Sequence, residues 1–220
     1  MPAHSVPPPT SSSALHYRIT PADLHAHLFH VSLTIPHPAA GQEVALPVWI
    51  PGSYLVRGFA KNLQKLTARQ GRQPVHLLQL DKARWQADCT DRHPLVLEYE
   101  VYALDNSVRT AWLDADRGFF NGTSLCLQVR GQEHLPHELS LASTRATRGW
   151  HVATGLDAVE VDGRGFGRYR AHDYDSLVDH PFELGTFWSG AFTACGVPHR
   201  FVVAGALPSF DGEKLLNDAR

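Results

Sequence analysis

The feature that most constrains the fold is an apolar alternation with a period of two residues, which recurs along much of the chain. In residues 25–35 it places apolar side chains on every second position: Phe29, Val31, Leu33 and Ile35. Residues 95–102 repeat the pattern, and residues 125–129 do so around Cys126 and Gln128. Such alternation is typical of β-strands with one face buried and the other in water.

Turn-forming pairs separate these stretches: Ala40-Gly41, Pro51-Gly52, Gln70-Gly71, Arg130-Gly131 and Asp162-Gly163. Glycine tolerates the backbone conformations that tight turns need, and Pro-Gly is typical of a type II turn. Short strands with regular turns between them indicate a mainly β protein with an antiparallel β-sandwich.

A few stretches depart from this pattern. Residues 55–66 carry apolar side chains at helical spacing and predict a helix: Val56, Phe59, Leu63 and Leu66. The nearly continuous apolar run at 201–207 predicts a strand buried on both faces. A helix with Leu215, Leu216 and Ala219 is expected near the end of the chain, capped by Ser209 or Asp211.

That last helix has about two turns before Arg220, which is short for a stable helix. We therefore expect the chain to be cut from a longer protein. The predicted organisation is a disordered Pro/Ser-rich tail over 1–13, an amino-terminal sandwich over 14–165, and the opening of a second, incomplete domain over 166–220. The last segment should expose apolar surface.

Composition excludes several classes of partner. The net charge of -2 gives no reason to expect a nucleic acid or an anionic membrane. The chain has no apolar run of the roughly 20 residues that span a bilayer, and its first residues lack the apolar stretch of a secretory signal. Its three cysteines, Cys89, Cys126 and Cys195, lie far apart and favour a reducing compartment, so we expect a cytoplasmic protein.

Histidine is abundant, with 14 residues, so metal sites need consideration. His25 and His27 could place two imidazoles on one strand face, but no third ligand is near, and histidines at the rim of the core are favoured. The segment 134–138, with His134, His137 and Glu138, lacks the second histidine of a zinc-peptidase motif and is interpreted as a loop before a strand. We predict no metal ligands here.

Three aspartates, Asp173, Asp175 and Asp179, could bind calcium or supply an acid/base pair. A helix-capping aspartate is the favoured interpretation. The chain has no Gly-x-Ser-x-Gly elbow, no dinucleotide fingerprint and no phosphate loop. The residues alone therefore indicate a β-rich module without a catalytic site.

Five strings carry a resemblance to a known family: 46–61 (LPVWIPGSYLVRGFAK), 107–113 (SVRTAWL), 118–125 (GFFNGTSL), 150–156 (WHVATGL) and 173–185 (DYDSLVDHPFELG). In order and spacing they resemble the amino-terminal part of the glycyl aminopeptidase family of zinc metallopeptidases with a PDZ domain. The resemblance covers about residues 15–220.

The resemblance implies a sandwich, a thermolysin-like (gluzincin) catalytic domain and a PDZ domain in one protein. It implies hydrolysis of peptides with release of small amino-terminal residues such as Gly or Ala, with zinc held in the full-length protein. The family's zinc helix lies downstream of the matched region, so no catalytic or zinc-binding residue transfers to this chain. The fragment should be inactive alone, with its partners being a peptide substrate and, in cis, the rest of the catalytic domain and the PDZ domain.

Two segments are candidates for flanking the substrate cleft. In the related gluzincin architecture a sandwich loop reaches toward the cleft, and Phe120, Asn121, Gly122 and Thr123 are its possible counterpart; a plain hairpin turn is the alternative. Asn121 and Thr123 could form hydrogen bonds, and Gly122 would let a backbone approach closely. The second segment is 179–185, where Glu183 could face an amine, but a role at the domain junction is the favoured interpretation.

A rival hypothesis is a non-catalytic β-sandwich that binds a protein or a carbohydrate. The aromatic residues that favour it are Trp49, Trp112 and Trp188. Packing in strand cores explains the same tryptophans equally well.

Overall fold

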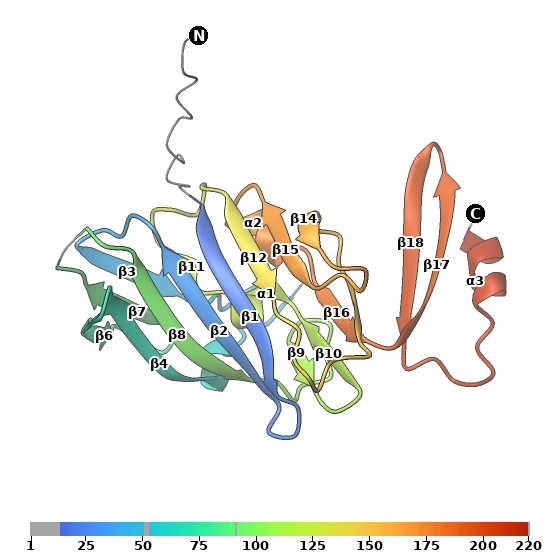
Figure 1. Cartoon of the computed structure of the whole chain (residues 1–220), viewed down its shortest axis with the longest axis horizontal. Helices are drawn as coiled ribbons and strands as arrows, with labels where there is room; N and C mark the ends of the chain where they lie inside the picture. The colour runs from blue at the N-terminus through green and yellow to red at the C-terminus, as the bar shows by residue number, and fades with distance from the viewer. Residues whose placement is uncertain (1–13, 51–52, 91, 220) are drawn as a thin grey trace, which may run out of the picture.

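The computed structural model describes residues 14–50, 53–90 and 92–219 and is dominated by β-sheets (Figure 1). The predicted tail at 1–13 and the predicted turn at Pro51-Gly52 lie outside the described residues.

The largest sheet has eight strands, and only its β1–β12 pair is parallel. In spatial order the strands are β14 (Asp157–Val161), β15 (Gly167–Ala171), β12 (His137–Leu141), β1 (Leu15–Asp23), β2 (Leu28–Ile35), β8 (Leu95–Tyr102), β4 (Leu63–Gln70) and β5 (Gln73–Pro74).

Two four-stranded sheets complete the sandwich. One contains β13 (His151–Ala153), β16 (Phe182–Gly185), β10 (Arg117–Phe120) and β9 (Ala111–Leu113). The other contains β11 (Gln128–Val129), β3 (Gly41–Ala45), β7 (Arg84–Asp88) and β6 (Leu77–Gln79). Inner-face side chains of all three sheets form one hydrophobic core, so the prediction of a mainly β, antiparallel sandwich is confirmed.

The predicted strands at 25–35 and 95–102 are confirmed as β2 and β8, which lie side by side. The inward side chains of β2, Phe29, Val31, Leu33 and Ile35, are fully buried, while its other face is half-buried. Apolar alternation therefore identified the face of the sheet that meets the core.

The helix predicted over 55–66 is wrong. Only a short 3-10 helix, η1 (Phe59–Asn62), forms there, and Leu63 begins strand β4. The pairing of β4 with β8 shifts register between Gln64 and Thr67, and Lys65 has a φ of 55°. This β-bulge moves the buried face by one position, so a bulged strand imitates the spacing of a helix.

The strand predicted around Cys126 is also largely wrong. The short helix α1 (Gly122–Leu125) ends at Leu125, and β11 holds only Gln128 and Val129. Leu125, Cys126 and Leu127 are all fully buried, so the segment between these elements does not alternate.

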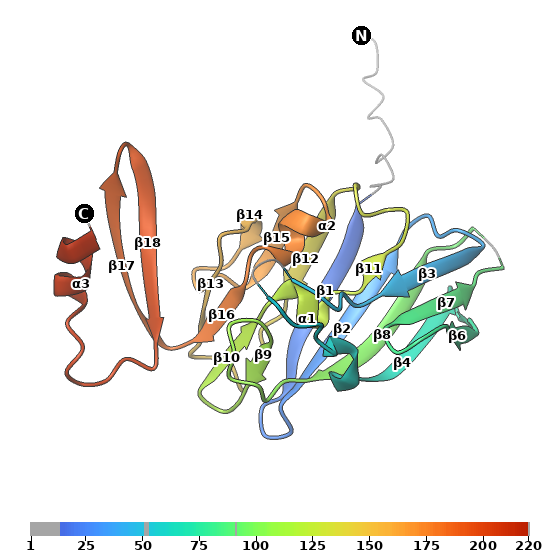
Figure 2. The same cartoon turned by 180° about the vertical axis from the view of Figure 1, so that it is seen from behind.

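Residues after 166 divide into two parts. β15, the helix α2 (Tyr174–Val178) and β16 pack in the sandwich core, where Tyr169, Tyr174 and Phe182 are buried. Strands β17 (Phe187–Ala194) and β18 (Val197–Ala204) form a separate hairpin that stands beside the sandwich together with α3 (Gly212–Ala219), as Figures 1 and 2 show.

The prediction of a strand buried on both faces at 201–207 is wrong, because this segment contains the end of β18 in the hairpin. β18 ends at Ala204, its residues are half-buried or exposed, and Leu207 is exposed. The helix predicted near the end is confirmed as α3, where the Asp211 carboxylate accepts a hydrogen bond from the backbone N–H of Lys214 at 3.0 Å.

Candidate functional site

The predicted cleft segment forms the end of β10 and the start of α1. The Asn121 side chain caps α1 by accepting a hydrogen bond from the backbone N–H of Thr123, and the Thr123 hydroxyl donates to the same oxygen at 3.1 Å. Phe120 is fully buried and stacks on Phe182, with ring centroids 4.9 Å apart. The segment is thus a strand-to-helix junction rather than a hairpin turn, and substrate contact by these residues stays a prediction.

Gly122 allows the backbone of α1 to approach the backbone of α2 closely. A Cβ atom at this position would lie 2.9 Å from Cα of Val178 and 3.2 Å from the carbonyl oxygen of Leu177. A glycine is therefore required for α1 and α2 to pack closely.

Glu183 lies on β16 beside β10, and its carboxylate forms a two-bond ion pair with the Arg117 guanidinium, with both N···O distances 3.1 Å. Burial raises the pKa of Glu183 above its ordinary value, and Arg117 opposes that rise. The carboxylate predicted to face an amine already has a cationic partner in this chain.

Three buried tyrosines fix the backbone that follows α1, and sequence reasoning did not find them. The hydroxyls of Tyr99, Tyr174 and Tyr17 donate to the carbonyls of residues 125, 126 and 127 in that order, at 2.6–2.7 Å. Burial raises the pKa of all three hydroxyls well above the ordinary value. This arrangement holds α1 firmly against the core.

The described loop residues 48–50 and 53–57 precede η1, and η1 packs against α1 (Figure 2). The backbone N–H of Arg57 donates to the carbonyl of Val48 at 2.6 Å, and the Trp49 indole donates to the carbonyl of Ser53 at 2.7 Å. These bonds close the loop on itself. They leave five apolar side chains exposed: Val48, Trp49, Tyr54, Leu55 and Val56.

Beside this loop lies a cavity of about 210 Å³, lined by residues 55–59, Lys61, Asn62, Asp105 and Thr110. The carbonyl of Thr110 accepts a hydrogen bond from the backbone N–H of Asn121 at 3.1 Å. Three of the five strings that carry the family resemblance therefore meet here. The cavity is the candidate functional site, and its conspicuous string at 46–61 was the sequence signal that could have located it.

The other histidines and aspartates that the structure describes do not gather into a metal centre. His25 and His27 lie in the turn between β1 and β2, not on a strand face, and the ring Nδ1 of His27 is 2.5 Å from the carbonyl oxygen of Leu113. Asp173 caps α2, as predicted, by accepting a hydrogen bond from Ser176 at 2.7 Å. Across the described ranges, no group of three or more His, Cys, Asp or Glu side chains could hold a metal ion.

The loop predicted at 134–138 is confirmed only up to Pro136, because His137 begins β12. The His137 ring lies between Tyr17 and Tyr174, its Nδ1 is 2.7 Å from the carbonyl oxygen of Leu135, and its Nε2 is buried without a hydrogen bond. Burial lowers the pKa of His137 below its ordinary value. This histidine is a core residue.

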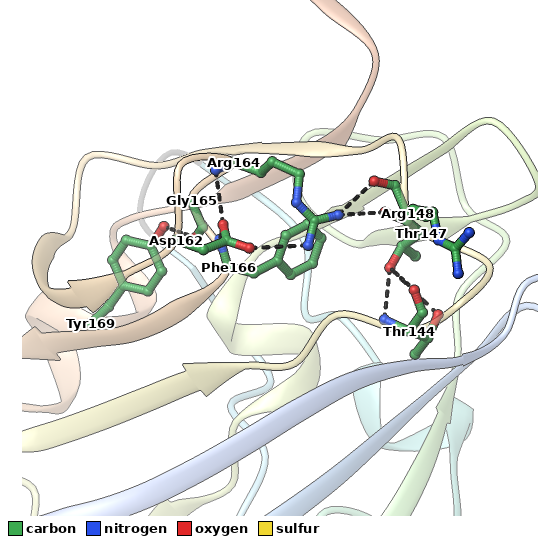
Figure 3. A network of polar contacts seen from close by, with 8 residues as sticks. All are labelled: Thr144, Thr147, Arg148, Asp162, Arg164, Gly165, Phe166 and Tyr169. Atoms are coloured by element: carbon green, nitrogen blue, oxygen red, sulfur yellow. Dashed lines mark hydrogen bonds and ion pairs between the residues drawn. The ribbon is translucent and has the colours of Figure 1, made fainter.

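A second, larger cavity of about 600 Å³ opens at the edge of the large sheet and includes Asp162 and Phe166. Figure 3 shows the polar network beside it. The Arg164 guanidinium donates to the carbonyl of Arg148 at 2.6 Å and to the Asp162 carboxylate at 3.0 Å, and the Tyr169 hydroxyl donates to the carbonyl of Gly165. These bonds tie two surface loops together and present no free reactive group.

Within the described residues, no helix has both the length and the apolar character needed to span a membrane.

The comparisons with known proteins agree with the sandwich. A crystal structure of an aminopeptidase N family protein from Idiomarina loihiensis is 43% identical over 93% of this chain, with a TM-score of 0.89. The chain spans 35% of that protein's length. No curated protein sequence matches this chain.

Two further structures share the fold at low identity. A mutant M1 zinc metallopeptidase from Deinococcus radiodurans with a bound Tyr-Ser-Ala substrate is 12% identical, with a TM-score of 0.50, over 90% of this chain and 48% of its own. Aminopeptidase A from Legionella pneumophila, in complex with aspartic acid, is 10% identical, with a TM-score of 0.50, over 87% of this chain and 24% of its own.

The Peptidase M61 N-terminal domain model matches residues 16–186, which include all strand residues of the sandwich except Leu15, the first residue of β1. The match covers far more than half of the chain. This chain therefore belongs to the Peptidase M61 N-terminal domain family.

Proposed function

We propose that this chain is the amino-terminal part of a zinc-dependent aminopeptidase that releases small amino-terminal residues such as Gly or Ala from peptides. The observation that carries the proposal is the match of residues 16–186 to a peptidase family, together with 43% identity to an aminopeptidase N family protein. The cytoplasmic location and the PDZ domain belong to the same proposal.

The described residues of this chain contain no cluster that fits a zinc site. In this proposal, the zinc ligands of the full-length enzyme lie outside the chain. The role of the chain is to present a surface beside the cleft, formed by a rigid α1 together with η1 and the described residues 48–50 and 53–57. The buried capping of α1 and the three tyrosine hydroxyls support this rigidity.

We also propose that the domain boundary lies near residue 186 rather than at 165. β15, α2 and β16 contribute to the sandwich core, and the family match ends at residue 186. The hairpin β17–β18 and α3 would then open a gluzincin catalytic domain.

The test compares purified chain 1–220 with the longest product of its gene. We expect zinc-dependent release of glycine or alanine from peptides by the longer product and none by chain 1–220, with zinc measured by elemental analysis in both. Zinc-dependent release by chain 1–220 would overturn the proposal, and so would a longer product that binds no zinc and cleaves no peptide.

The second candidate is a non-catalytic module that binds a protein or a carbohydrate. The observation that favours it is the exposed aromatic surface at the loop, where Trp49 is 54% exposed and Tyr54 is fully exposed. A glycan array and a pull-down, each with Trp49→Ala as the matched control, distinguish a binding module from the amino-terminal part of a peptidase. Specific capture that Trp49→Ala abolishes, without peptidase activity in the longer product, favours the module.

A further inference from the structure

The cavity beside η1 has a positively charged lining. Two cationic side chains, Arg57 and Lys61, and one anionic side chain, Asp105, line it. Neither cation forms an ion pair with any residue that the structure describes. A cavity with two unpaired cations and one carboxylate favours an anionic group on its ligand.

The guanidinium of Arg57 is oriented by its own loop. Its Nε donates to the Ser53 hydroxyl at 3.1 Å, and Ser53 is buried. This bond uses one edge of the guanidinium and leaves the amino groups able to donate to a ligand. A guanidinium that is already oriented by a hydrogen bond loses less conformational freedom on binding a carboxylate than an unrestrained guanidinium does.

The remaining lining suits a peptide. Leu55 and Val56 are 66% and 79% exposed and supply an aliphatic rim, while Asn62 adds an amide that can pair with a peptide group. A volume of about 210 Å³ admits a short segment rather than a folded protein.

We propose that this cavity binds the free carboxylate of a short peptide, with Arg57 and Lys61 as the cations that hold it. The identification of the ligand as a peptide rests on the proposed function. In the longer enzyme, this contact would favour short substrates, whose carboxyl end reaches the cavity while their amino end lies at the reaction centre.

The experiment is an NMR titration of chain 1–220 with triglycine, triglycine amide and inorganic phosphate. We expect saturable shifts of the amide signals of Gly58, Asn62 and Thr110 with triglycine, and about tenfold weaker binding of the amide, since a charge-assisted hydrogen bond is lost. Equal binding of the acid and the amide would overturn the proposal. Phosphate binding as tight as that of triglycine would also overturn it, because the cavity would then be a general anion site.

Two variants identify the cations. Lys61→Gln and Arg57→Gln should each reduce the preference for triglycine over its amide to about twofold or less. Lys82→Gln, which removes an exposed cation from the turn between β6 and β7, is the matched control and should leave the preference unchanged. If Arg57→Gln disturbs the loop, Lys61→Gln alone tests whether the cations bind the carboxylate, because no described residue pairs with the Lys61 side chain.

An unchanged preference for triglycine over its amide in Lys61→Gln would contradict the assignment of Lys61 as a carboxylate-binding cation. This test is independent of catalysis. A longer product without peptidase activity would remove the proposed function and leave a positive titration standing, whereas a negative titration beside an active enzyme would remove only this inference.

Discussion

The sandwich and the hairpin–helix unit at 187–219 are both built from strands with apolar residues, yet they bury them very differently. Side chains such as Phe29 and Phe120 in the sandwich are fully excluded from water, whereas no residue of β17 or β18 is buried. In the sandwich a second layer covers each inner face. In the hairpin, α3 covers part of β17 through the contact of Leu216 with Trp188, and Phe210, just before α3, packs on the same tryptophan. Apolar alternation is enough to form a strand, but a core forms only where a second layer of structure covers the apolar face of that strand.

The largest expected contrast is between two phenylalanines. Phe182→Ala should destabilise the chain by about 3–5 kcal/mol, because a fully buried ring leaves a cavity, while Phe192→Ala should cost about 1 kcal/mol or less. Urea unfolding of both variants measures the difference. Equal losses would show that the hairpin is as well packed as the sandwich.

A smaller contrast concerns glycine. Gly122→Ala should cost about 1–3 kcal/mol, because its Cβ would press on the backbone of α2 at Val178. Gly149→Ala is the matched control, since nothing lies within 4 Å of a Cβ built there. Thermal unfolding of the two variants tests the close approach of α1 and α2. A neutral Gly122→Ala would contradict it.

The ion pair between Arg117 and Glu183 joins β10 to β16 on the half-buried face of their sheet, away from the hydrophobic core. Arg117→Met should cost about 1–2 kcal/mol, because it leaves a largely buried carboxylate without its partner. Arg200→Met in the hairpin, where the guanidinium is exposed, should change stability by about 0.5 kcal/mol or less. Chemical unfolding compares them, and the double variant Arg117→Met/Glu183→Gln should recover part of the first loss.

The smallest expected effect depends on pH. Burial lowers the pKa of His137 in the folded chain, so the unfolded chain binds the proton more readily. Stability should therefore fall as the pH drops from roughly 7 to roughly 5, through and below the ordinary histidine value. His137→Gln should lose this part of the pH dependence, whereas His199→Gln on the exposed hairpin should keep it. Urea midpoints at both pH values provide the measurement.

Sequence reasoning located the strands that follow simple alternation, such as β2 and β8, and the cap at Asp173, and it named Asp211 as one of two possible caps of α3. It failed at β4, because the bulge at Lys65 shifts the pattern, and around Cys126, where side-chain hydroxyls replace strand pairing. Both failures come from contacts between residues far apart in the sequence, which no local period can reveal.

The candidate site was predicted only in part. The resemblance was enough to name Phe120–Thr123 and Glu183 as candidates. Their contacts could be seen only in the folded chain, where the partners are Arg117, Phe182 and α2. The cavity beside η1 was missed because residues 55–66 were interpreted as a helix, which would have hidden the loop that forms its wall.

The three tyrosine hydroxyls also bear on the order of folding. They join the segment after α1 to residues 26, 48 and 110 positions away, so these bonds form only when distant strands have already met. Tyr174 is the last of the three to leave the ribosome. The surface formed by α1 and η1 is therefore completed late, and a nascent chain that ends before Tyr174 cannot hold it in its final shape.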